Sequence, residues 1–210
     1  MATAAELAAL RQRIANLLIG ATCSRIHFRW GNIDFRSGGF VVVGMSLGVA
    51  PATRTGHGAR RQMGVDVESM PAGVGAMYRA GPNNIVVPTA SYGSSHDERM
   101  CLVHEATHAV FDYHRIRATA LEEEACSYLA GAMFDLIENY SIVRPAGSIF
   151  AVALDIARDF VMPTRQLRPW ATDVSPAQRA RLISAVRHSS TYSHLHNHPS
   201  TRYPHNSGRI

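Results

Sequence analysis

The chain has 210 residues, a length that suits one compact domain with its own hydrophobic core. Hydrophobic residues make up 46% of it, yet no apolar run approaches the roughly 20 residues of a membrane-spanning helix, which argues against a helical membrane protein. The formal net charge is +5, and because the arginines are spread along the chain rather than clustered, the charge does not indicate a nucleic-acid-binding surface.

The first predicted element is an amphipathic helix over residues 4–19. A cleavable signal peptide is a weaker interpretation of this stretch, because its apolar part is short and contains Asn16. The three cysteines, Cys23, Cys101 and Cys126, form no C-x-x-C pair, and their odd number argues against a disulfide framework. We therefore expect a cytoplasmic protein, or one that is exported without a cleavable signal peptide.

Strand patterns follow the first helix. Residues 25–37 alternate apolar and polar side chains on both sides of a Gly-Asn pair, which predicts a β-hairpin. The apolar run at 38–47 predicts a more buried strand. Residues 48–75 lack periodicity and predict a long loop, either mobile or functional. A short strand is predicted at 85–87, before Pro88.

The second half of the chain is predicted to be helical. Ser95 and Glu98 have the spacing of a capping box, which predicts a helix over about 96–113. Further helices are predicted over about 118–140, over about 147–161, and after the Ser-Pro pair at 175–176. The fold class is therefore α+β, with a small antiparallel or mixed N-terminal sheet, an edge strand, and then a helical half. We expect one domain over 1–188 and a flexible, histidine-rich tail over 189–210.

The helix predicted over 96–113 contains the sequence HEATH. On a helix, His104 and His108 lie on one face about 6 Å apart along the axis, so both imidazoles can reach one metal ion. Glu105 projects about 100° away around the helix, where it can reach a water on the metal and act as general base. Zinc lowers the pKa of such a water to about 7, which is the chemistry of amide hydrolysis.

Two sources of a third ligand are open. His114 lies six residues after His108, the spacing of metzincin peptidases, but that arrangement needs a glycine where Phe111 stands. A helix that continues past Phe111 would carry His114 about 9 Å further along its axis. His114 is therefore expected at the C-terminal end of the helix, where its charge suits the helix dipole.

The other source is the run of three glutamates that begins the next helix. At about 100° per residue, most apolar residues of 121–137 form one stripe, and Glu122 lies closest to it. Glu124 lies about 100° from the stripe and is the reserve, whereas Glu123 is expected to be solvated. This argument favours Glu122 as the third ligand.

HEATH followed by EEEACSYLA resembles the gluzincin metallopeptidases, in particular the small bacterial ImmA/IrrE-type proteases and certain membrane-linked peptidases. The resemblance covers about residues 83–135. It implies a zincin-like fold and one Zn²⁺ per chain, held by His104, His108 and Glu122. In those families the position of Cys126 often holds Asn or Asp, which supports a zinc histidine, and the strand before the motif helix pairs with an extended substrate, a place that 85–87 would take.

The sequence thus predicts a zinc-dependent peptidase acting on peptides or proteins, with Glu105 as general base and with no nucleic-acid or membrane partner. The oxyanion-stabilising group stays open among Tyr113, Tyr128, Tyr140 and other side chains. One alternative is a catalytically silent zinc-fold binding or effector protein, with which the absence of lysine is compatible. The other is a metzincin-like peptidase that uses His114.

Overall fold

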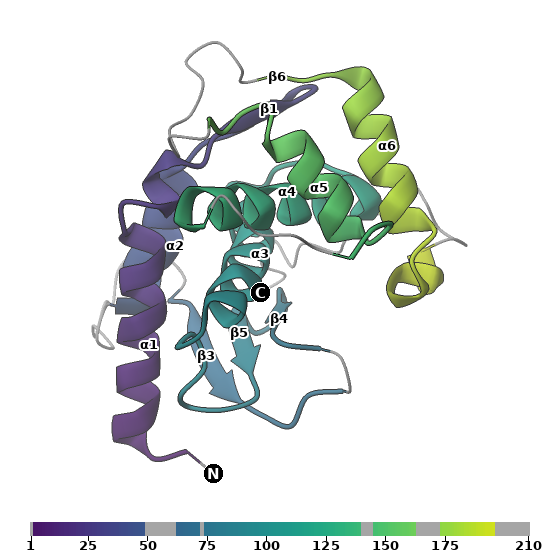
Figure 1. Ribbon diagram of the computed structural model, residues 1–210. Coiled ribbons are helices and arrows are strands. Elements are labelled where there is room, and N and C mark those ends of the chain that lie inside the picture. The colour runs from purple at the N-terminus through teal and green to yellow at the C-terminus, as the bar shows by residue number, and fades with distance from the viewer. Residues whose placement is uncertain (1, 49–61, 72–73, 140–144, 163–172, 196–210) are drawn as a thin grey trace.

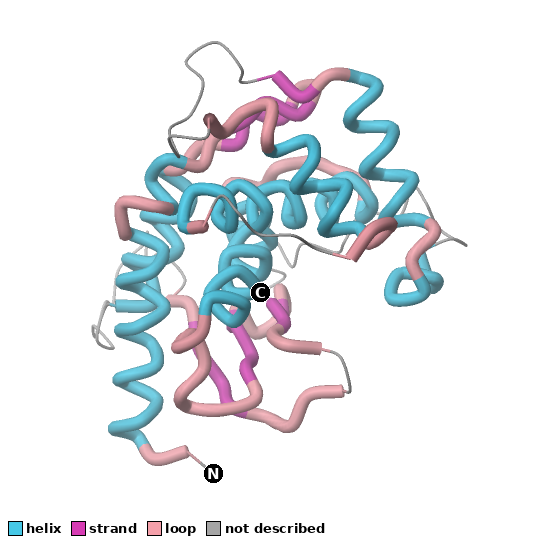
Figure 2. The backbone as a smooth tube through the Cα atoms, in the orientation of Figure 1, coloured by secondary structure: helices cyan, strands magenta, loops and turns pink. Residues whose placement is uncertain are grey.

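The computed structural model describes residues 2–48, 62–71, 74–139, 145–162 and 173–195. This part of the chain contains six α-helices and two small three-stranded sheets, which agrees with the predicted α+β class (Figures 1 and 2). The helices are α1 (Ala4–Ile19), α2 (Gly38–Gly48), α3 (His96–Tyr113), α4 (Ala120–Glu138), α5 (Ile149–Ala157) and α6 (Pro176–Arg187). The strands are β1 (Phe28–Trp30), β2 (Ile33–Phe35), β3 (Gly64–Val67), β4 (Met77–Arg79), β5 (Asn84–Val87) and β6 (Asp173–Val174). Two short 3₁₀ segments complete the list, η1 (Cys23–Arg25) and η2 (Ser190–Leu195).

The helices begin where their capping residues predict. Thr3, Ser95, Thr119 and Ser175 each accept a hydrogen bond from a backbone amide of the first turn, and each is the first residue of a complete capping box. The predicted ranges of α1 and α3 are confirmed at both ends. α4 and α5 are each a few residues shorter than predicted.

One of the two sheets contains the predicted hairpin. β1 and β2 pair antiparallel, with Trp30 opposite Ile33, and Gly31 adopts the positive φ of 59° that the tight turn requires. The two-residue strand β6, which the sequence analysis did not predict, pairs parallel with β1 on its other side.

The other sheet has the order β3-β5-β4 and corrects two predictions. β3 lies within the stretch predicted as a long loop, and it pairs parallel with β5. Residues 49–61 and 72–73 of that stretch lie outside the described residues. β5, the strand predicted as an edge, is the central strand, because it is flanked by β3 and by the antiparallel β4. In the described part of this sheet, β4 is an edge strand.

The predicted strand at 38–47 is wrong, because these residues form α2. Phe40, Val43 and Leu47 are buried at helical spacing. Two glycines permit close helix packing: a Cβ at Gly39 would lie 2.5 Å from Cγ1 of Val110 in α3, and one at Gly44 would clash with α1. Packing against two helices thus overrides the β propensity of the valine run.

α4 occupies the centre of the helical half. It packs against α3, α5 and α6, as Figure 1 shows, and 16 of its 19 residues are buried. α3 also contacts β4. The middle of α3 lies between the two elements, because His104 is close to Glu124 at the start of α4 and Glu105 accepts a hydrogen bond from Tyr78 in β4. His104, Glu105 and the glutamates at the start of α4 lie in this region.

Candidate metal centre

α3 presents its two motif histidines side by side. Their Nε2 atoms are 3.4 Å apart, and the rings meet at 66°. Apolar side chains on the same helix, Leu102, Val103 and Ala106, are fully buried and fix the rotation of α3 in the core. The side chains of His104 and His108 keep 14% and 10% exposure, so the pair lies at the margin of the core, within reach of solvent.

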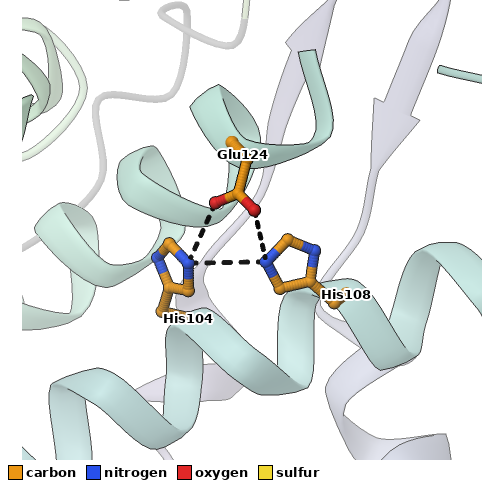
Figure 3. A group of neighbouring side chains, drawn as sticks. All are labelled: His104, His108 and Glu124. Carbon is orange, nitrogen blue, oxygen red and sulfur yellow. Dashed lines mark hydrogen bonds and ion pairs between the residues drawn. The ribbon is translucent and has the colours of Figure 1, made fainter. Parts of the chain in front are cut away.

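Glu124 of α4 completes a group of three potential metal ligands, shown in Figure 3. Its carboxylate oxygens lie 3.4 Å from His104 Nε2 and 3.7 Å from His108 Nε2, and its side chain is 5% exposed. A tetrahedral zinc ion with ligands at about 2.0–2.1 Å separates its ligand atoms by roughly 3.3–3.4 Å. The two imidazole nitrogens and Glu124 Oε2 on the His104 side match this spacing, whereas the 3.7 Å to His108 belongs to the other carboxylate oxygen, Oε1. One ligand atom from each of the three residues lies within 4.8 Å of the others, so the group could hold a metal ion.

The structure differs from the sequence-based expectation at the third position, since it does not bring Glu122 to the histidines. Glu122 occupies the third position of α4, where its Oε2 accepts hydrogen bonds from Thr119 N–H at 2.9 Å and from the Thr119 hydroxyl at 2.8 Å. A carboxylate in this position caps the start of the helix. The prediction of Glu122 relied on the apolar stripe of residues 121–137 to identify the side of the helix that faces α3. Because α4 is buried on nearly all sides, its apolar residues do not mark that side.

Glu123 is buried, not solvated as predicted. It is 2% exposed, and its Oε1 lies 2.8 Å from His108 Nδ1. The carboxylate favours a proton on Nδ1, so that Nε2, which faces His104 and Glu124, is the nitrogen that a metal ion would bind after losing its own proton. Burial opposes a charge on His108, but Glu124, Glu123 and Glu105 outweigh it and raise the pKa of His108 to about 10. A metal ion at this site would therefore displace a proton.

Glu105 lies beside the three-residue group without belonging to it. Its Oε1 is 4.0 Å from His104 Nε2, and its Oε2 accepts a 2.7 Å hydrogen bond from the backbone N–H of Tyr78 in β4. Burial raises the pKa of Glu105, although the two histidines and the Tyr78 N–H favour its charged form. A carboxylate with a raised pKa at the rim of a metal site suits proton transfer.

Two tyrosines border the group on the side of α4. The ring of Tyr128 meets that of His104 edge-on, with centroids 4.6 Å apart, and its hydroxyl lies 3.2 Å from that of Tyr192 in η2. Burial raises the pKa of Tyr128 to about 12, so the phenol is protonated at neutral pH. Sequence reasoning missed Tyr192 because it placed residues 189–210 in a disordered tail. Residues 196–210 lie outside the described residues.

The other candidates lie away from the group or outside the described residues. His114 is exposed at the C-terminal end of α3, where its ring packs against Tyr113, and this position matches the expectation for a helix-end histidine. Cys126 is fully buried, which raises the pKa of its thiol well above the usual range. The carboxylate that contacts a motif histidine is that of Glu123, 2.8 Å from His108 Nδ1. Tyr140 lies outside the described residues.

Comparisons of the chain with protein-family models, with curated proteins and with solved structures found no match. Among the described helices, none has both the length and the apolar character that crossing a bilayer requires.

Proposed function

We propose that the protein is a zinc-dependent peptidase in which His104, His108 and Glu124 hold one zinc ion and Glu105 is the general base. The observation that carries the proposal is the convergence of three metal-binding side chains beside a carboxylate that does not join them. As in the gluzincin arrangement, two histidines come from one helix and a glutamate from the next. The glutamate is now Glu124, two residues after the Glu122 that the sequence favoured.

The partial exposure of the site favours catalysis over a purely structural metal site. Structural zinc sites are closed by four protein ligands, whereas catalytic sites use three and leave one position for water or substrate. Among the described residues three side chains converge, and the side chains of His104 and Glu105 keep 14% and 15% exposure.

A bound zinc ion would supply a Lewis acid that makes a water acidic and polarises a substrate carbonyl. Glu105 takes the proton of the attacking water at its carboxylate and then delivers it to the leaving amine. The raised pKa of Glu105 brings it closer to neutrality, where a carboxyl both accepts and donates a proton readily. The Tyr78 N–H holds one carboxylate oxygen and leaves the other on the side of His104.

β4 is the strand on which we place the substrate. It forms an edge of the described β3-β5-β4 sheet, and the N–H of its central residue points away from β5 to Glu105. An extended peptide added along this edge would pass beside the general base. This role replaces the one first expected for 85–87, which lie in the centre of the sheet.

Hydrolysis of a denatured protein or a peptide library by the zinc-loaded chain tests the proposal. Wild type is expected to cleave, and Glu105→Gln is expected to lose at least about 100-fold in rate, because general-base catalysis contributes typically 10²–10⁴-fold. The zinc content of the two proteins is expected to be equal, and this result would show that Glu105 is not a ligand. Glu98→Gln on the same helix is the matched control, since glutamine also completes a capping box.

The silent binding protein is the second candidate, and the same assay separates it. A wild type that binds zinc but cleaves no peptide of the library, or one that cleaves no faster than Glu105→Gln, would refute the peptidase and leave a zinc-binding recognition domain.

A further inference from the structure

The connection between α3 and α4 carries three basic side chains on the surface of the protein. His114, Arg115 and Arg117 are all exposed, whereas Ile116 between them is partly buried and packs against the core. This connection joins the helix that holds His104 and His108 to the helix that holds Glu124, so the basic side chains lie at one end of the candidate metal centre.

The two arginines of this connection differ from other surface arginines in their surroundings. Five described arginines lie 2.5–3.5 Å from a carboxylate oxygen, namely Arg29, Arg36, Arg79, Arg99 and Arg181. Within the described part of the chain, no carboxylate forms an ion pair with Arg115 or Arg117. Their charges are therefore not neutralised by a described carboxylate and can attract an anionic group from outside.

Arg115 also holds a backbone conformation that favours glycine. Its φ is 52°, in a Schellman motif where its N–H donates to the carbonyl of Asp112 at 3.1 Å and the Ile116 N–H donates to that of Phe111 at 2.9 Å. Glycine is the usual residue at this position, because a Cβ crowds the backbone at positive φ. The exposed side chain adds nothing to the core, and strained residues of this kind concentrate at functional sites.

β4, on which we place the substrate, advances along α3 toward this connection. Before the strand begins, a Cβ at Gly75 would lie 3.4 Å from Cys101 Sγ in the second turn of α3. At the centre of the strand, the N–H of Tyr78 donates to Glu105, which is one turn further along α3. The strand and the helix therefore run side by side in the same direction.

The strand and the helix also end together. The Tyr78 hydroxyl lies 2.7 Å from Asp112 near the end of α3 and 3.0 Å from Asn83 in the turn after β4. Along α3, His114 is six residues beyond His108, or about 9 Å. An extended peptide advances about 3.3 Å per residue, so roughly three residues cover the distance from the metal centre to the basic connection.

We propose that Arg115 and Arg117 select substrates that carry an acidic side chain about two to four residues from the cleaved bond, on the side that lies toward the C-terminal end of α3. The inference rests on the proposed peptidase function and on the placement of the substrate along β4. A guanidinium suits this role, because its planar set of donors pairs with both oxygens of a carboxylate.

Peptides that differ only in one charge test the inference. Once the peptide library has identified a cleaved bond, Glu, Gln or Lys is placed about two to four residues from it on either side, and kcat/KM is measured with the zinc-loaded full chain. Wild type is expected to prefer Glu over Gln roughly 5-fold on one side of the bond, the upper range for an exposed ion pair. The preference should arise in KM rather than kcat, because the ion pair is present before and during the reaction. It should shrink as the salt concentration rises from about 0.05 to 0.5 M.

Variants of the connection assign this preference to the arginines. Arg115→Gly removes one charge where glycine relieves the backbone, so the ratio of Glu to Gln cleavage should fall while the melting temperature does not. Arg115→Lys keeps the charge and should keep most of the ratio. Arg115→Gly combined with Arg117→Gln should bring the ratio close to one. Arg158→Gln is the matched control, since Arg158 is an exposed arginine at the end of α5 with a helical φ of −62°, and the ratio should stay as in wild type.

Equal kcat/KM for the Glu and Gln peptides in wild type would overturn the inference and leave the proposed peptidase intact. A preference for Glu that survives the loss of both arginines would also overturn it. A wild type that cleaves no peptide would refute the proposed function, and this inference with it. A preference that falls in Arg115→Gly and is kept in Arg115→Lys and Arg158→Gln supports the role assigned to the connection.

Discussion

Replacing Glu122 and Glu124 separately by alanine distinguishes a helix cap from a metal ligand two residues apart. Glu122→Ala removes the acceptor of two hydrogen bonds from Thr119, at 2.9 and 2.8 Å, and touches neither histidine. Loss of a cap costs about 1 kcal/mol. For a chain of this size, 1 kcal/mol corresponds to roughly 2–4 °C in the melting temperature.

Glu124→Ala removes the carboxylate that lies 3.4 and 3.7 Å from the two imidazole nitrogens. Losing an outer hydrogen-bond partner of a metal ligand costs roughly 10- to 100-fold in affinity, and losing the ligand itself should cost more than about 100-fold. Purified without added metal, Glu122→Ala is therefore expected to carry as much zinc as wild type, and Glu124→Ala little.

The assays are zinc per chain after gel filtration and calorimetric melting of the metal-free proteins. The metal-free Glu122→Ala should melt roughly 2–4 °C below wild type, which shows that its cap is lost while its zinc is kept. Loss of zinc from Glu122→Ala together with full zinc in Glu124→Ala would refute the geometry described for α4. Full zinc in both variants would return His114 to consideration as the third ligand.

Three further predictions concern the surroundings of the site. Glu123→Gln should weaken zinc binding roughly 10- to 100-fold in a chelator competition without abolishing it, because it alters only the partner of His108, and an unchanged affinity would contradict this role. In the metal-free protein, the pKa of His108 is raised from 6.5 to about 10, so the stability it contributes is present below pH 6.5 and is lost as pH rises toward 10. The melting temperature of the metal-free protein should fall over that window while the zinc affinity rises. A melting temperature that rises and a zinc affinity that falls over the same window would show that His108 is not charged in the metal-free protein. Tyr78→Phe loses hydroxyl contacts with Asp112 and Asn83, at 2.7 and 3.0 Å, and should melt a few degrees lower with little change in peptide cleavage, since its N–H still reaches the general base.

The sequence predicted the motif helix well because its signals are local. The capping box at Ser95 and Glu98 defines the start of α3, and the i, i+4 spacing alone places His104 and His108 on one face. The Gly31 turn likewise identified the β1–β2 hairpin. In these cases a few neighbouring residues determine the structure, and no distant contact opposes them.

Features that depend on distant contacts were not predictable in this way. Choosing between Glu122 and Glu124 needed the direction from which α3 packs on α4, and a helix buried on nearly all sides carries no apolar stripe that reveals it. The strand predicted at 38–47 is a helix because Gly39 and Gly44 admit close neighbours. The capping box at Thr119 was the one local signal that could have assigned Glu122 to a capping role. The glutamate of such a box accepts a hydrogen bond from the N-cap backbone N–H, so its carboxylate is held at the start of the helix.

The hydrogen bond between Glu105 and Tyr78 has a consequence for how this site tolerates mutation. The donor is a main-chain amide, which every residue except proline supplies. Substitutions at 78 can therefore remove the hydroxyl contacts of the side chain, and lower the stability, while the Glu105 carboxylate keeps its backbone partner. A scan that replaces side chains one at a time would report position 78 as dispensable for the proposed chemistry, although its backbone N–H holds the carboxylate that we propose as general base. The proline variant alone would reveal the contact, at the additional cost of disturbing the edge strand.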